Sequence, residues 1–139
     1  MFRDFRSAIG SATVTAALAT SAVAQDAEAI AAAIGHQLDA FKGGDLGAAW
    51  DDASPGIQRM FGSAQNFSDM VRSGYPMVWD NAGVTYLDLR TEADGRLWQR
   101  VRIIAADGTL HLLDYAMIAT PGGWKIDAVV MLPAPDVGV

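Results

Sequence analysis

Regularly spaced turn signals in the second half of the chain constrain its fold more than any other feature. Asp94-Gly95 and Asp107-Gly108 are typical of two-residue β-hairpin loops, and Pro121-Gly122-Gly123 marks a third turn. The signals are about 13 residues apart, which leaves strands of about 10 residues between them. The pattern predicts an antiparallel meander of four strands, over residues 84–91, 97–105, 110–120 and 124–132.

The first half of the chain has helical periodicity. Ile30, Ile34, Leu38 and Phe41 recur at helical spacing and predict one buried stripe on a helix that begins with Asp26 as its N-cap. Gly43-Gly44 is expected to end this helix.

Shorter helices are expected to follow, each with its own capping residue. Asp45, Ser54 and Ser63 are suitable N-caps, and Pro55 suits the first position of a helix. Gly74-Tyr75-Pro76 ends the helical half, and residues 77–79 are interpreted as a short edge strand. The buried candidates on these helices are Ile57, Met60, Phe61, Phe67, Met70 and Val71.

Helices followed by a run of strands are typical of the α+β class, with N-terminal helices packed on one face of an antiparallel meander sheet. Strands of this length twist and curl. We therefore expect a curved sheet whose open side is covered by a helix, which makes a cone with an internal cavity for a small ligand.

The N-terminus has the pattern of an export signal over residues 1–24. Arg3 and Arg6 precede a mildly apolar run over residues 8–20, and Ala22-Val23-Ala24 is a small-x-small cleavage site. The run is shorter than the roughly 20 apolar residues of a membrane-spanning helix. We expect a single domain over residues 25–139, located in the periplasm or secreted, with no membrane contact after cleavage. The alternative is an ordinary Ala-rich amphipathic helix.

Composition excludes several classes of function. The formal net charge is −6, which disfavours nucleic-acid binding because phosphates require clustered cations. The chain has no cysteine, so disulfides, thiolate metal sites and cysteine nucleophiles are excluded. His36 and His111 have no carboxylate at metal-ligand spacing, and we expect neither a metal nor a cofactor.

The expected hairpin register defines a candidate site. With two-residue loops, Asp88 lies beside Val101 and Val101 beside Asp114, so that all three share one sheet face. This face is the more apolar of the two, and we expect the helices to cover it. The polar residues on it are the candidate pocket residues: Tyr86, Asp88, Arg90, Gln99 and Asp114.

Desolvation inside a pocket would raise the pKa of Asp88 or Asp114 and suit either residue to acid/base chemistry or to anchoring a ligand. Two alternatives remain open. One is a structural cluster in which Arg90 pairs with Asp88 or Asp114. The other is a β-bulge that turns Tyr86, Asp88 and Arg90 to solvent.

Further segments carry a family resemblance: QLDAF (37–41), Asp45, AW (49–50), ASPGIQ (53–58), FGS (61–63), NF (66–67), MV (70–71), YP (75–76), Gln99-x-Val101, Tyr115 and GWKI (123–126). Together they resemble a bacterial family of unknown function, DUF4864, over essentially the whole mature chain. More distantly, the layout is similar to the cystatin-like cone of nuclear transport factor two and ketosteroid isomerase. That superfamily includes isomerases, dehydratases, ligand binders and interaction domains, so the resemblance implies no single activity.

We expect a non-catalytic exported module that binds a small molecule or a protein partner. The first alternative is a small periplasmic isomerase or hydrolase-like enzyme that uses a carboxylate inside the cone. The second alternative is a purely structural interaction domain with a filled core. The opposite sheet face, with Trp98, Arg100, Arg102 and Tyr115, is expected to be the surface of a homodimer, although Trp98 stacked on an arginine would also explain the aromatic residue there.

Overall fold

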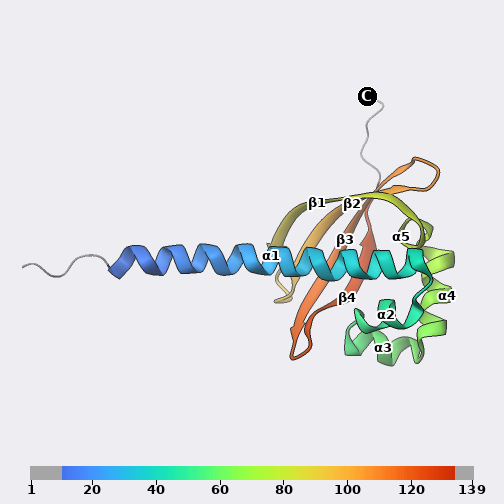
Figure 1. Cartoon of the computed structure of the whole chain (residues 1–139), viewed down its shortest axis with the longest axis horizontal. Coiled ribbons are helices and arrows are strands. Elements are labelled where there is room, and N and C mark those ends of the chain that lie inside the picture. Colours follow the sequence, from blue (N-terminus) through green and yellow to red (C-terminus); the bar gives the residue numbers. More distant parts are fainter. Residues whose placement is uncertain (1–10, 134–139) are drawn as a thin grey trace, which may run out of the picture.

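The computed structural model describes the backbone of residues 11–133 and the side chains of residues 23–133. Helices occupy the N-terminal half and four antiparallel strands the C-terminal half, in the sheet order β1-β2-β3-β4 (Figure 1). This arrangement confirms the predicted α+β class and meander. The elements are α1 (Ser11–Gly43), α2 (Leu46–Asp51), α3 (Pro55–Phe61), α4 (Ala64–Gly74), α5 (Pro76–Trp79), β1 (Asn81–Thr91), β2 (Leu97–Ala105), β3 (Leu110–Thr120) and β4 (Gly123–Met131).

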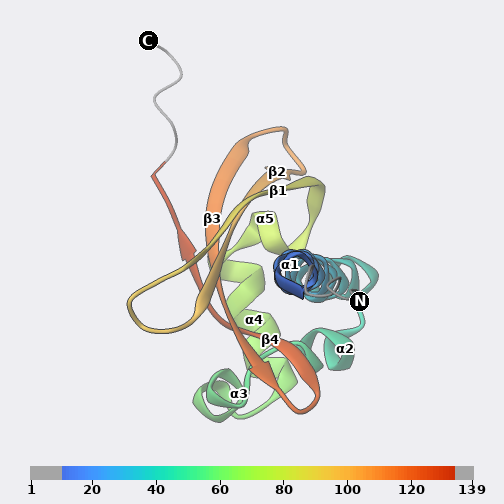
Figure 2. The ribbon, with the colours of Figure 1, turned by 90° about the vertical axis from the view of Figure 1, so that its left-hand side faces the viewer.

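Helix α1 crosses the sheet and supplies one side of the core. Ile30, Ile34, Leu38 and Phe41 are all at most 2% exposed, which confirms the predicted stripe. The predicted start at Asp26 is wrong, because the helix already runs through this residue from Ser11. Residues 11–34 contain neither glycine nor proline, so nothing in them interrupts an Ala-rich helix. Figure 2, viewed nearly along α1, shows the helix on the same side of the sheet as α4 and α5.

The predicted leader lies largely outside the described residues, since residues 1–10 and the side chains of residues 11–22 are not described. Its cleavage and the export of the protein therefore remain predictions. Within residues 11–133, no helix has the length and apolarity that a membrane crossing requires.

The short helices begin at the predicted caps. Asp45, Ser54 and Ser63 each accept a hydrogen bond from the backbone N–H three residues later, at 3.1 Å. Residues 77–79 are not the predicted edge strand. Pro76 instead starts α5, in which the N–H groups of Val78 and Trp79 donate to the Tyr75 carbonyl.

Both predicted hairpins form, but each loop has three residues instead of two. Gly108 N donates to the Ala105 carbonyl at 2.9 Å, and Ala105 N donates to Thr109 at 2.8 Å. The first hairpin has the same two bonds: Gly95 N donates to the Glu92 carbonyl, and Glu92 N donates to the Arg96 carbonyl. Gly95 and Gly108 have φ angles of +84° and +90°, as expected for a turn that is followed by a left-handed glycine. The extra residue shifts the β2–β3 register by one, and Val101 pairs with Leu113 instead of Asp114.

The register shift turns β3 over relative to the prediction. Leu113, Tyr115 and Met117 are fully buried in the core. Tyr115 was predicted on the opposite face, and the structure corrects that position. We call the sheet face turned away from the helices the outer face.

Candidate functional site

The structure does not bring the five predicted pocket residues together on one face. Asp114 and Arg90 lie on the outer face, where Asp114 pairs with Arg100 and Arg90 pairs with Trp98 in the sheet register. A β-bulge between Tyr86 and Leu89 carries Asp88, whose side chain is 62% exposed. The predicted facing is therefore wrong for these three residues, for two local reasons: the longer loops and the bulge.

Tyr86 and Gln99 do face the helices. The Gln99 side-chain amide donates to the carbonyls of Leu87 at 3.0 Å, Asp88 at 3.3 Å and Arg100 at 2.8 Å. Gln99 thus stabilises the backbone of the bulge. Tyr86 packs against the core beside α1, and burial, followed by the negative charge of Asp39, raises the pKa of its hydroxyl.

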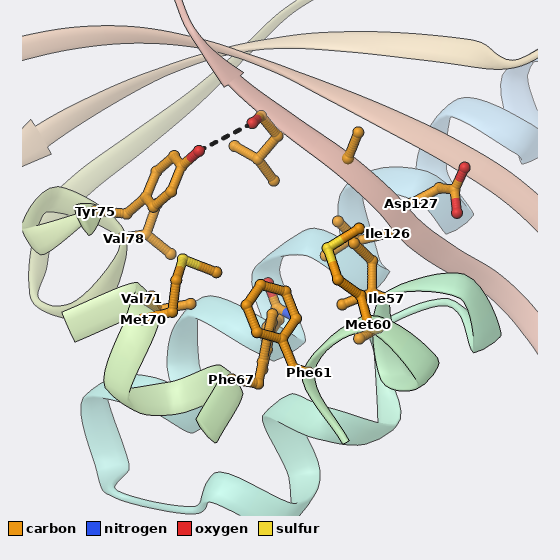
Figure 3. Close-up of a pocket in the computed structure, with 14 residues that line it drawn as sticks. Ile57, Met60, Phe61, Phe67, Met70, Val71, Tyr75, Val78, Ile126 and Asp127 are labelled. Carbon is orange, nitrogen blue, oxygen red and sulfur yellow. Dashed lines mark hydrogen bonds between the residues drawn. The ribbon is translucent and has the colours of Figure 1, made fainter. Parts of the chain in front are cut away.

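An apolar groove with a volume of about 310 Å³ lies between α3, α4, α5 and β4 (Figure 3). Ile57, Met60 and Phe61 of α3 line one side, and Tyr75 and Val78 of the α5 segment line the other. The complete lining is Gln37, Ala53, Ile57, Met60, Phe61, Phe67, Met70, Val71, Tyr75, Val78, Ile126, Asp127, Ala128 and Val129. We call this hollow the apolar groove.

Aromatic rings form part of the wall of the apolar groove. Phe67 of α4 lies with its ring centroid 5.6 Å from Phe61, 5.7 Å from Trp50 and 5.9 Å from Phe41. These residues come from α1, α2, α3 and α4. Offset and edge-on contacts at this separation are favourable. The wall is therefore fixed by packing among four helices.

Three polar side chains border the apolar groove, and each already has a partner. The Gln37 amide donates to the Ala49 carbonyl at 3.1 Å, and the Tyr75 hydroxyl donates to the Val129 carbonyl at 3.2 Å. Asp127 accepts from Ser54 Oγ at 2.7 Å and from Arg96 Nη1 at 2.8 Å. Its carboxylate points away from the apolar centre (Figure 3).

The lining residues that come from α3 and α4 were predicted as core, not as a site. Met60 is 72% exposed, so the prediction that it is buried is wrong, whereas Ile57 and Phe61 are partly buried and pack against the core. The seven-residue helix α3 carries three large apolar side chains, but the sequence does not show whether another element covers them.

The two histidines belong to separate surface contacts. His36 Nδ1 lies 2.5 Å from Asp52 Oδ2, and His111 Nε2 lies 2.9 Å from the Thr109 hydroxyl. Among the residues with described side chains, no three histidine or carboxylate groups come together in a way that could hold a metal ion.

The fold and the groove define a small α+β protein in which short helices and an edge strand enclose an apolar hollow. Residues 23–139 match the family model of the domain of unknown function DUF4864, and the chain belongs to that family. This match confirms the resemblance stated from the sequence. No curated protein matches the chain.

Proposed function

We propose that the protein is a non-catalytic binding module that takes an apolar group of its ligand into the apolar groove. The observation that carries this proposal is the lining: twelve of its fourteen residues are hydrophobic or carry an aromatic ring, and the side chains of the other two, Gln37 and Asp127, already have partners. Binding sites commonly occur as mostly apolar hollows of about 300 Å³ or more.

The size of the groove limits the group that it holds. A dry apolar cavity of about 150 Å³ accommodates one benzene molecule. A groove of about 310 Å³ is therefore expected to hold about two rings or a branched aliphatic group of similar size. Met60 and Met70 at its wall have flexible side chains that adjust to differently shaped groups.

Charge favours a neutral group. The one ionisable carboxylate at the groove is Asp127, and the chain has a formal net charge of −6. An anionic headgroup would meet this negative field without a cationic side chain in the lining.

The alternative of an enzyme that uses a carboxylate inside the cone is disfavoured, because neither of its candidate acids faces the interior. Asp114 is tied to two arginines on the outer face, and Asp88 is exposed on the bulge. The alternative of a purely structural domain would be supported by a filled interior, whereas the groove favours binding. The distant likeness to the cystatin-like superfamily is part of this proposal, since that group includes ligand binders.

A neutral fluorescent probe tests the proposal. N-phenyl-1-naphthylamine, whose fluorescence rises in apolar surroundings, is titrated into the protein. We expect Met60→Glu to weaken binding about tenfold, because it places a charge at the rim of the groove. Met131→Glu is the matched control, since Met131 is also exposed, at 48%, but does not line the groove. Equal affinities of the two variants would contradict the proposal.

Export is a separate proposal. We propose that residues 1–24 are removed and that the mature protein is periplasmic or secreted. This proposal is supported by the sequence, in which positive charges, an apolar run and a cleavage site follow one another as in an export signal. N-terminal sequencing of the protein from the native periplasm is expected to begin at Gln25 or Asp26. An N-terminus before residue 20 would contradict cleavage.

The outer face is the proposed surface for a homodimer. Arg96 stacks on Trp98 at 5.0 Å, so that an arginine partly covers the aromatic ring. Arg100 and Arg102 lie beside it on β2. Sedimentation at high micromolar concentration tests this proposal, and a monomer there would contradict it.

A further inference from the structure

We infer that the apolar group bound in the groove is a side chain of an extended peptide, which adds as a strand to the free edge of β4. This inference rests on the proposed function. It names the partner as a polypeptide segment, and it depends on backbone groups that the groove itself does not supply.

Strand β4 is the last strand of the sheet, so one of its edges has no neighbouring strand of the sheet. In an antiparallel pair, the N–H and C=O of one residue point toward the partner strand, and those of the next residue point away. Leu132 N donates to the Leu112 carbonyl at 2.9 Å, which places the Leu132 backbone toward β3. By alternation, the backbone groups of Val129 and Met131 point to the free edge.

The same edge already accepts an extended segment further back. Ile126 N donates to the Asp52 carbonyl and Ser54 N donates to the Ile126 carbonyl, both at 2.8 Å. These two bonds form a parallel bridge between Ala53 and Ile126. The bridge ends there, because Pro55 begins α3. The edge is therefore able to pair with extended backbone, and the pairing stops before Val129.

Beyond the bridge, the edge of β4 has unused hydrogen-bonding groups. The Val129 carbonyl accepts from the Tyr75 hydroxyl at 3.2 Å. No described residue pairs with the N–H of Val129 or with the N–H and C=O of Met131. A free strand edge is a template for another extended chain.

The groove and the free edge meet at Val129. Four consecutive residues of β4, from Ile126 to Val129, line the groove, so that the groove runs alongside the strand. Alternate side chains of a strand point to the same face. A peptide paired with Val129 and Met131 therefore directs one side chain toward the helices and the groove. Hydrogen bonds to β4 hold its backbone, and the groove selects an apolar side chain.

The length of the free edge favours a peptide over a second copy of this chain. Residues 129–131 span about 10 Å at the usual rise of a strand. A stable dimer buries at least about 1,200 Å², which is more than a pairing of this length alone supplies. A single extended segment needs only the few backbone bonds and one side-chain contact that this edge offers.

The substitution Met131→Pro tests the contribution of the strand edge independently of the groove. Proline removes the N–H of Met131, which points outward, and it leaves the bonds between β3 and β4 in place. Met131→Ala is the matched control, because it shortens the side chain and keeps the N–H. Neither change touches the lining of the groove, so N-phenyl-1-naphthylamine should bind both variants as it binds the unchanged protein.

The test uses blocked five-residue peptides at millimolar concentration. The central residue is phenylalanine, leucine or aspartate, and the other residues are threonine. We expect the phenylalanine or leucine peptide to displace the probe and to slow amide hydrogen exchange at Val129 and Met131. The aspartate peptide should do neither. Met131→Pro should weaken peptide binding at least fivefold relative to Met131→Ala.

Two results would overturn the inference. In the first, the probe binds but the peptides neither displace it nor protect the two amides. In the second, the amides are already protected without peptide and light scattering gives twice the monomer mass, which assigns the edge to a second copy. Absence of probe binding would instead contradict the proposed function.

Discussion

Arg90 on β1 reaches across β2 to bind Asp114 on β3. Arg90 Nη1 lies 3.0 Å from Asp114 Oδ1, and Nη2 donates to Oδ2. Arg100 adds a contact of 3.3 Å to the same carboxylate, whose side chain is only 7% exposed. Burial alone would raise the pKa of Asp114, but the hydrogen bonds from Arg90 and Arg100 outweigh it, and the pKa is lowered. The carboxylate is thus an ionised link between three strands.

Asp114→Asn is expected to destabilise the protein by about 2 kcal/mol at pH 7, because it leaves two arginines without their buried partner. Because the folded-state pKa of Asp114 is lowered, its contribution is fully present above the unfolded pKa of about 4 and is lost as the pH falls through the folded value. Urea unfolding at pH 7 and below pH 4 measures both effects. Asp88→Asn is the control, since Asp88 is 62% exposed and lies 3.9 Å from Arg90. Equal losses for the two variants would contradict the prediction.

The fold could be predicted because its signals are local. Asp-Gly pairs indicate where strands end, and capping residues such as Ser54 and Ser63 indicate where helices begin. The strand bounds 97–105 and 110–120 coincide with the structure. Which sheet face a side chain points to was not predictable in the same way, because one extra loop residue reverses it. The Asp-Gly signal is compatible with both a two-residue loop and a three-residue loop.

The groove could not be predicted because it depends on how the helices pack. The sequence shows that Ile57 and Phe61 are apolar residues of a short helix, but it does not tell whether another element covers them. The free edge of β4 likewise depends on where the bridge at Ala53 stops. Both features are arrangements between distant segments, which local patterns do not specify.

His36 is expected to make stability depend on pH near neutrality. The hydrogen bond to Asp52 raises the pKa of His36, and the charges of Asp52, Asp45 and Asp39 raise it further. A group with a raised folded-state pKa stabilises the protein fully below its unfolded value, about 6.5, and loses this effect as the pH rises through the folded value. His36→Gln should therefore cost up to about 0.5 kcal/mol at pH 6, because the pair is exposed, and nothing at pH 9.

Thermal or urea unfolding of His36→Gln at the two pH values provides the measurement. His111→Gln removes the other histidine and leaves the contact between His36 and Asp52 in place, so it serves as the control. A loss at pH 9 that equals the loss at pH 6 would show that packing, and not the charge of His36, is responsible.

Ser54→Ala is expected to cost more than Ser63→Ala. Both serines cap a helix, which is usually worth about 1 kcal/mol. Ser54 is completely buried and also donates to Asp127 at 2.7 Å, so its loss removes a hydrogen bond to a charged group as well. We expect about 2–3 kcal/mol for Ser54→Ala and about 1 kcal/mol for Ser63→Ala, measured by urea unfolding. Equal costs would mean that the link to β4 adds nothing.

Gly35 and Tyr86 are expected to be coupled across the contact between α1 and β1. A Cβ atom on Gly35 would lie 3.1 Å from the Tyr86 hydroxyl, which is tighter than ordinary contact. Alanine is favoured over glycine inside a helix by about 0.5–1 kcal/mol, so Gly35→Ala combines a gain with a clash. With Tyr86→Phe the hydroxyl is gone, and the gain should remain alone. A double-mutant cycle by urea unfolding should show Gly35→Ala to be destabilising with Tyr86 present and stabilising by about 0.5 kcal/mol in the Tyr86→Phe background. The same effect in both backgrounds would mean that the Tyr86 side chain moves aside without cost.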